Sequence, residues 1–211
     1  MYATAMMNDT VLALALFALV ASITPGPNNL MLLASGTNYG FRRTVPHLLG
    51  VNIGFTLMLI LVGTGVMQIF RVFPPAFLVL KVFAFAYLLY LAYRIATATP
   101  GFDSTEPDAR RPFSFLEAAL FQWVNPKAWT MALTANTTFA AEPGSATGIA
   151  LVAAVFMVMN LPSISLWAVV GVYIRALLSR PALARAFNVV AAALLLGSLY
   201  PMVVATVPEA F

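Results

Sequence analysis

The sequence contains no cysteine, a single histidine and very little charge: only 9% of its 211 residues are Asp, Glu, Lys or Arg. Without cysteine the chain can form no disulfide bond, no thiolate metal site and no thiol redox centre. It also has no HExxH motif and no paired aspartates in an apolar segment, so it lacks the side chains that an intramembrane enzyme requires. We therefore expect no catalytic site, no metal and no cofactor.

Apolar residues dominate the composition instead. Hydrophobic residues make up 62% of the chain and the mean hydropathy is +0.92, whereas an ordinary soluble domain has about 25% charged residues. This composition predicts an all-α integral membrane protein surrounded by membrane lipid. The formal net charge of +4 comes mostly from basic residues beside apolar runs, where they indicate membrane topology rather than nucleic-acid binding.

Six apolar segments are long enough to cross a bilayer, which takes about 20 residues of helix. They cover residues 9–35, 45–70, 75–98, 114–140, 147–177 and 183–207. No Lys or Arg precedes the first segment and no convincing small-residue cleavage site follows it. We therefore interpret this segment as a retained membrane span rather than a signal peptide.

A polar connector, residues 100–113, divides these six spans into two sets of three. It contains three prolines and three acidic residues, as is typical of a solvated loop. The chain then consists of a first three-helix repeat, residues 1–99, and a second, residues 114–211, within one membrane domain. Because each half has an odd number of spans, homologous halves would form inverted repeats.

Basic residues mark one side of the predicted membrane domain. Those that follow the first, third and fifth spans are Arg42, Arg43, Arg94, Arg110, Arg111, Arg175, Arg180 and Arg185. The opposite side offers only Arg71. By the positive-inside rule the connector is cytoplasmic and both termini face outward.

Two proline-bearing breaks interrupt apolar helices at the start of each half. The first, SITPGPNNLMLL, contains Pro25, Gly26, Pro27, Asn28 and Asn29; the second, FQWVNPKAWTMAL, contains Asn125, Pro126 and Lys127. Proline leaves backbone groups without helical partners, which is costly in hydrocarbon, so such a break persists only beside protein or a water-filled cavity. Many secondary transporters build their substrate site from paired broken helices.

We expect these eight residues to bind substrate. The N-terminus of the half-helix near Asn28 could hold a carboxylate, and the freed carbonyls could hold an ammonium group, which together suit a zwitterion. The alternative is that both breaks are packing kinks whose freed groups are satisfied by neighbouring helices.

Besides Lys127, three further polar residues within the predicted spans are candidates for the same site. Lys127 lies too deep for easy snorkelling; it either binds substrate or protons, or fills a gap by bonding the carbonyls that Pro126 frees. Lys81 lies near the outer end of the third span, so binding and snorkelling are both open. Asn52 and Asn160 occupy the second helix of each half, where they bind substrate or hydrogen-bond between helices.

Other features have simpler structural explanations. Glu117 is the only carboxylate near a span interior, but with Ser114 it fits a capping box at a helix start, which we prefer to a role as proton carrier. His47 falls at the cytoplasmic mouth of the second span and suits an interfacial position. A small-residue face suits close helix contact within the bundle or in a homodimer; it consists of Gly50, Gly54, Gly63 and Gly65.

The segments ITPGPNNLMLLASGTNYGFRRTVPHLLGVNIG, LKVFAFAYLLYLAYR and NPKAW resemble the LysE/RhtB family of amino-acid exporters over essentially the whole chain. The resemblance implies a multi-pass protein of the bacterial inner (plasma) membrane that exports amino acids or close derivatives with the proton gradient. Family members usually have a small residue shortly after the lysine of the third span, where this chain has Phe83, Ala84 and Phe85.

Together these observations predict a secondary-active exporter that moves a neutral amino acid out of the cytoplasm by proton antiport. A neutral substrate is expected because no acidic residue clearly lies in the presumed pocket. A channel and a passive scaffold remain alternatives, although no ring of charge favours an ion channel. An intramembrane enzyme is the least favoured class.

Overall fold

The computed structural model describes residues 2–66, 72–73, 75–98, 111–140, 144–178 and 180–198. Arg71, Arg110, most of the predicted connector and the ends of the second and sixth predicted spans (67–70 and 199–207) lie outside these ranges. All the regular structure in the described residues is helical, which confirms the predicted all-α class. The elements are α1 (Tyr2–Ile23), α2 (Pro27–Tyr39), α3 (Phe41–Gly63), α5 (Pro75–Ala96), α6 (Phe115–Phe121), a 3-10 turn η1 (Gln122–Val124), α7 (Pro126–Phe139), α8 (Ala146–Leu177) and α9 (Pro181–Gly197).

Three described helical segments are long and apolar enough to cross a membrane: Phe41–Gly63, Leu78–Ala96 and Ala146–Arg175. The pair α1 and α2 also qualifies as one span with a bend of 56° at its break. The apolar helices Phe115–Val124 and Ala182–Gly197 are shorter. The described helices thus provide three or four candidate spans by length, and the arrangement of six spans in two inverted repeats stays a prediction.

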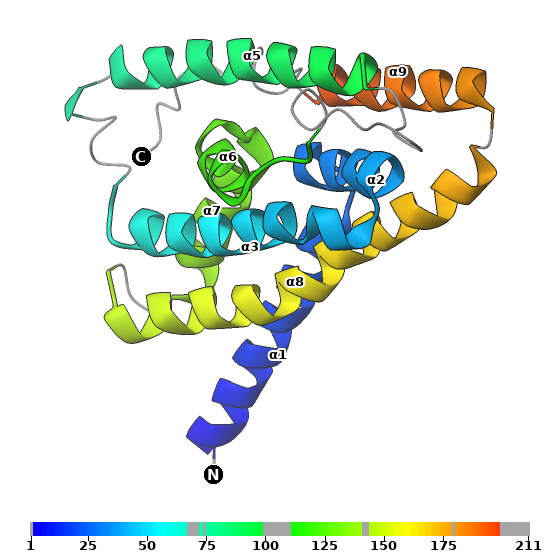
Figure 1. The fold of residues 1–211 in the computed structure, drawn as a ribbon. Helices are drawn as coiled ribbons and strands as arrows, with labels where there is room; N and C mark the ends of the chain where they lie inside the picture. Colours follow the sequence, from blue (N-terminus) through cyan, green and yellow to red (C-terminus); the bar gives the residue numbers. More distant parts are fainter. Residues whose placement is uncertain are drawn as a thin grey trace.

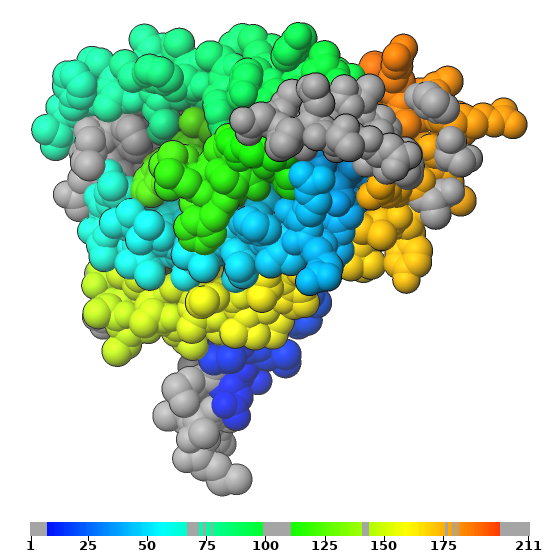
Figure 2. Space-filling model, in the orientation of Figure 1, coloured from blue at the N-terminus to red at the C-terminus, as the bar shows by residue number. Residues whose placement is uncertain are grey.

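The helices pack in layers around the two broken segments (Figure 1). Helices α5 and α9 form one outer layer, α2 and α6 lie beneath it, and α3 and α8 follow, with α1 crossing α8 at an angle. On the face drawn in Figure 2, α5, α3 and α8 are successive bands of surface. Large apolar side chains remain exposed on these helices, including Val82, Phe83 and Tyr93 of α5, which suits a surface that meets lipid.

Glycines allow the backbones of α2 and α8 to approach closely. A Cβ atom added at Gly36 would lie 2.1 Å from the carbonyl oxygen of Ala168, and one added at Gly171 would lie 2.2 Å from that of Leu33. The hydroxyl of Thr37 also donates a hydrogen bond to the carbonyl of Gly171 at 3.0 Å. No side chain larger than hydrogen fits at either glycine without moving backbone.

The predicted small-residue face of the second span packs inside the bundle, against α6. A Cβ atom at Gly50 would lie 2.3 Å from the carbonyl oxygen of Phe115, and one at Gly54 would lie 2.6 Å from the Cα of Ala119. Gly63 does not continue this face, because a Cβ atom there would meet Asn136 of α7 at 2.5 Å and Ile149 of α8 at 2.7 Å. Gly65 does not either, because it lies beyond the end of α3 in a turn with φ of +95°. The face is used within the chain, so it gives no support to a homodimer.

The region around the start of α6 confirms the predicted capping box and corrects the position expected for His47 of α3. The hydroxyl of Ser114 accepts a hydrogen bond from the backbone N–H of Glu117 at 3.2 Å, and the Glu117 carboxylate accepts one from the N–H of Ser114 at 2.7 Å, which is the predicted capping box. His47 is fully buried rather than interfacial. The ring of Phe113, 5.2 Å away between centroids, packs against the imidazole.

Candidate functional site

The first break separates α1 from α2 at the segment Thr24–Gly26. Proline disfavours the helical conformation in the residue before it and removes a backbone donor, so Pro25 ends α1. Pro27 then occupies the first helical position of α2, where its missing N–H has no cost. Gly26 between them is fully extended, with φ of −179° and ψ of 176°. The first predicted break is therefore confirmed.

The second break has a similar local construction. Helix α6 tightens into η1, Asn125 is extended with φ of −90° and ψ of 110°, and Pro126 begins α7. The side-chain oxygen of Asn125 caps α7 by accepting a hydrogen bond from the backbone N–H of Lys127 at 3.1 Å. This confirms the predicted break and gives Asn125 a defined structural role.

Side chains satisfy the carbonyl groups that the first break leaves at the end of α1. Asn29 donates from its amide to the carbonyl oxygens of Ser22 and Thr24, both at 2.8 Å. Trp167 of α8 donates from its indole N–H to the carbonyl of Ile23 at 3.0 Å. Hydrogen bonds from α2 and α8 therefore stabilise the break.

Lys127 completes this set from the second broken helix. Its ammonium donates to the carbonyl oxygen of Thr24 at 2.6 Å and lies 2.8 Å from the Thr24 hydroxyl and 3.4 Å from the carbonyl oxygen of Pro25. The stem of Lys127 passes Gly26 so closely that a Cβ atom there would lie 2.7 Å from Cδ. A cation thus lies at the negative, C-terminal end of α1. Its carbonyl partners belong to the other break rather than to the one that Pro126 makes.

A reciprocal pair of amides joins the two breaks a second time. The amide of Asn28 donates to Gln122 at 2.8 Å, and the amide of Gln122 donates back to Asn28 at 3.1 Å. Gln122 is fully buried and also donates to the carbonyl of Ala118 at 2.9 Å. Sequence reasoning missed Gln122, whose only signal was a polar side chain three residues before Asn125.

The asparagines predicted on the second helix of each half meet across the bundle. Asn160 of α8 donates to the side-chain oxygen of Asn52 of α3 at 2.9 Å, and Asn52 donates to the carbonyl of Met157 at 3.2 Å. Both side chains are buried. The structure thus provides the interhelical hydrogen bond that was one of the two explanations for these residues.

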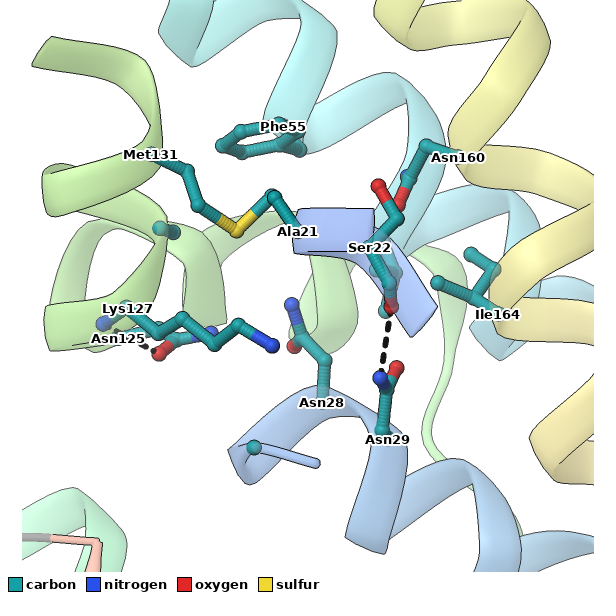
Figure 3. A pocket seen from close by; sticks show the side chains of 13 residues that line it. Ala21, Ser22, Asn28, Asn29, Phe55, Asn125, Lys127, Met131, Asn160 and Ile164 are labelled. Carbon is teal, nitrogen blue, oxygen red and sulfur yellow. Dashed lines mark hydrogen bonds between the residues drawn. The ribbon is translucent and has the colours of Figure 1, made fainter. Parts of the chain in front are cut away.

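A cavity of about 20 Å³ lies where these groups converge (Figure 3). This volume has room for about one water molecule. The predicted residues that line the cavity are Gly26, Asn28, Asn29, Asn125, Lys127 and Asn160. The lining residues that sequence reasoning did not identify are Ala21, Ser22, Val51, Phe55, Ala128, Met131 and Ile164. Asn52 and the prolines 25, 27 and 126 support the cavity from outside its lining, and Lys81 lies away from it on α5.

A second cavity, of about 30 Å³, lies beside α2 and α5 and includes Arg94 and Arg111 in its lining. Arg111 forms two hydrogen bonds to the carboxylate of Glu117, at 2.8 and 3.0 Å. Glu117 is therefore engaged by both a cation and a helix cap.

Near this cavity a buried amide pair, which sequence reasoning missed, joins Asn38 of α2 to Asn188 of α9 at 3.1 Å.

Comparison with known proteins identifies the family of the chain. The family model for the LysE type translocator matches residues 19–198, a range that includes both breaks. The cysteine/O-acetylserine efflux proteins of Escherichia coli (strain K12), Shigella flexneri serotype 5b (strain 8401) and Shigella sonnei (strain Ss046) are each 32% identical to this chain over 123 residues. The aligned part covers 58% of this chain and 62% of each relative's length.

No solved structure matches the chain. The family model nevertheless extends from the last turns of α1 to the end of α9. The chain therefore belongs to the LysE type translocator family, whose members are multi-pass membrane transporters rather than enzymes.

Proposed function

We propose that this protein is a secondary-active exporter that moves a neutral amino acid, or a close derivative, out of the bacterial cytoplasm in exchange for protons. Its family supports transport, and the relatives are named for efflux of cysteine and O-acetylserine, which are both neutral α-amino acids. The proposal includes six spans in two inverted repeats, with both termini outside the inner membrane.

The observation that carries the proposal is the contact between the two breaks. The Lys127 ammonium and the carbonyl of Thr24 are opposite partners for the two charged groups of a zwitterion. A substrate carboxylate can bind Lys127 and the N-terminus of α2, which has no side-chain cap. The substrate ammonium group can then bind the carbonyls that Lys127 releases.

The lining of the cavity favours a substrate without net charge. No Asp or Glu lines it in the part of the chain that the structure describes. A cationic side chain would therefore find no counter-charge, and Lys127 would repel it. An anionic side chain would compete with the α-carboxylate for the same lysine.

The small volume of the cavity supports alternating access. About 20 Å³ accommodates one water but no amino acid, so the helices must rearrange before a substrate can enter the cavity. Transport requires a second arrangement in which the breaks separate, and substrate and proton must differ in affinity between the two.

The test is exchange transport by the purified protein in liposomes. Vesicles are loaded with unlabelled cysteine or serine, and entry of the radiolabelled amino acid is followed for the wild type, for Lys127→Met and for Thr130→Ala as a control on the same helix. We expect saturable exchange that Lys127→Met lowers at least about tenfold, because a single lost charged contact has this size. Thr130→Ala should behave as the wild type.

A pH gradient distinguishes the coupled exporter from its alternatives. Net efflux should stop when a protonophore collapses the gradient, whereas exchange of labelled for unlabelled substrate should continue. Flux that neither saturates nor shows exchange would indicate a channel. Normal exchange by folded Lys127→Met would overturn the assignment of the site.

A further inference from the structure

One polar group that lines the cavity is left without a partner. Among the buried side-chain oxygens and nitrogens of the described residues, the hydroxyl of Ser22 accepts and donates no hydrogen bond. The residue is only 4% exposed. Buried polar groups are almost always paired, and an exception in a native structure calls for an explanation.

The local backbone does not account for this hydroxyl. Serine and threonine in helices usually turn the hydroxyl back to a carbonyl of the preceding turn. Thr24 does so with Ala21 at 2.9 Å, and Ser163 does so with Met159 at 2.7 Å. Ser22 makes no such bond, although its own carbonyl is bound by Asn29. The Ser22 hydroxyl therefore has no hydrogen-bond partner among the described residues, and it can pair with a ligand in the cavity.

Ser22 lies away from the charged end of the cavity. Figure 3 shows Ser22 and Asn160 on one side, Lys127 and Asn125 on the opposite side, and the apolar side chains of Phe55 and Met131 beside them. The cavity therefore has a charged end and a second, uncharged polar end.

We infer that Ser22, assisted by Asn160, contacts the side chain of the transported amino acid, and that the site selects small neutral amino acids whose side chain forms a hydrogen bond. This inference rests on the proposed function. If Lys127 and the freed carbonyls bind the groups that all α-amino acids share, the side chain extends toward Ser22. A hydroxyl both donates and accepts, so it can pair with a hydroxyl, an ester or an amide.

The site should select polar substrate side chains because an apolar side chain leaves the buried Ser22 hydroxyl without a hydrogen-bond partner. A site that is built to hydrogen-bond a substrate strongly rejects the analogue without that group, because its own buried polar atom stays unpaired. An apolar pocket, in contrast, distinguishes poorly between substrates that differ by a hydroxyl. Phe55, Met131 and Ile164 in the lining limit the size of the side chain that fits.

The experiment measures competition in the exchange assay with amino acids that differ by one hydroxyl. Serine against alanine and threonine against valine are the two pairs, and each unlabelled amino acid competes with labelled serine. For the wild type we expect the polar member of each pair to compete at least about tenfold better. Ser22→Ala should reduce this ratio to about twofold or less while exchange of alanine persists, and Ser22→Thr should retain the preference.

A matched control is Ser163→Ala, which removes a buried serine hydroxyl from α8 outside the cavity lining. It should leave the ratio as in the wild type. Equal competition within each pair by the wild type, or an unchanged ratio in Ser22→Ala, would overturn the inference while the proposed function stands. If the folded wild type exchanges no amino acid at all, the proposed function fails first and this inference fails with it.

Discussion

Asn28 and Gln122 are 94 residues apart in the chain, yet their side-chain amides form two hydrogen bonds with each other. One residue is in the first turn of α2 and the other is in the 3-10 turn before α7. This pair joins the two broken helices beside the cavity, next to the bond between Lys127 and Thr24.

The amide pair should show strong energetic coupling. Asn28→Ala leaves the side-chain oxygen of the buried Gln122 without its donor, and Gln122→Ala leaves the half-buried amide of Asn28 without its partner. Each variant should therefore lose about 1–3 kcal/mol of stability. The double variant should lose less than the sum, by about 0.5–2 kcal/mol. Unfolding in detergent micelles measures all four proteins. Additive losses would show that the two amides do not depend on each other.

The glycine contacts between α2 and α8 predict a second set of variants. Gly36→Ala and Gly171→Ala should each destabilise the protein by about 1–3 kcal/mol, because the new methyl group meets a backbone carbonyl that cannot move alone. Gly197→Ala in α9 is the control, since no atom of the described residues lies within 4 Å of its Cβ position. The measurement is again unfolding in micelles. Equal stability of Gly36→Ala and Gly197→Ala would contradict the close approach.

Glu117 allows its structural role to be separated from proton transfer. Glu117→Gln keeps an oxygen for the N–H of Ser114 and should lose well under 1 kcal/mol, because a half-exposed ion pair contributes little. Glu117→Ala removes the capping box and should lose about 1 kcal/mol. Both variants should retain proton-driven efflux in the vesicle assay. Loss of that coupling in Glu117→Gln, with exchange intact, would place Glu117 on the proton path.

The two breaks and the helix cap could be predicted because their causes are local. Proline ends a helix through its own ring and its missing N–H, whatever the rest of the fold does. The capping box of Ser114 and Glu117 is likewise contained within four residues. These features have a signature within a few positions of the sequence, and the structure reproduces them at Pro25, Asn125 and Ser114.

The partners of the polar residues could not be predicted, because they come from distant parts of the chain. Trp167 binds a carbonyl 144 residues earlier, and Lys127 binds one 103 residues earlier. A lone Gln122 or Ser22 in an apolar segment creates no periodic pattern. His47 was wrongly expected at the interface, because hydropathy gives its place along α3 but not the packing of Phe113 over it.

Span lengths were also harder to predict than span positions. Hydropathy sums composition over a window and does not show where a helix breaks within that window. The segment 114–140 divides into α6, η1 and α7, and the helix at the sixth predicted span, α9 (Pro181–Gly197), has only 17 residues in the described part of the chain.

The close glycine contacts join helices in two pairs, and each pair combines one helix from each half of the sequence. Gly36 and Gly171 hold α2, and with it α1, against α8, whereas Gly50 and Gly54 hold α3 against α6. Side-chain hydrogen bonds make the other connections beside the cavity: Lys127 to the carbonyl of Thr24, Asn28 to Gln122 and Asn160 to Asn52. Water or a ligand can take over such hydrogen bonds. The glycine contacts, in contrast, leave no space for another group between the two backbones. We therefore expect a change in helix arrangement to exchange the hydrogen bonds around the cavity while the two glycine-packed pairs stay together.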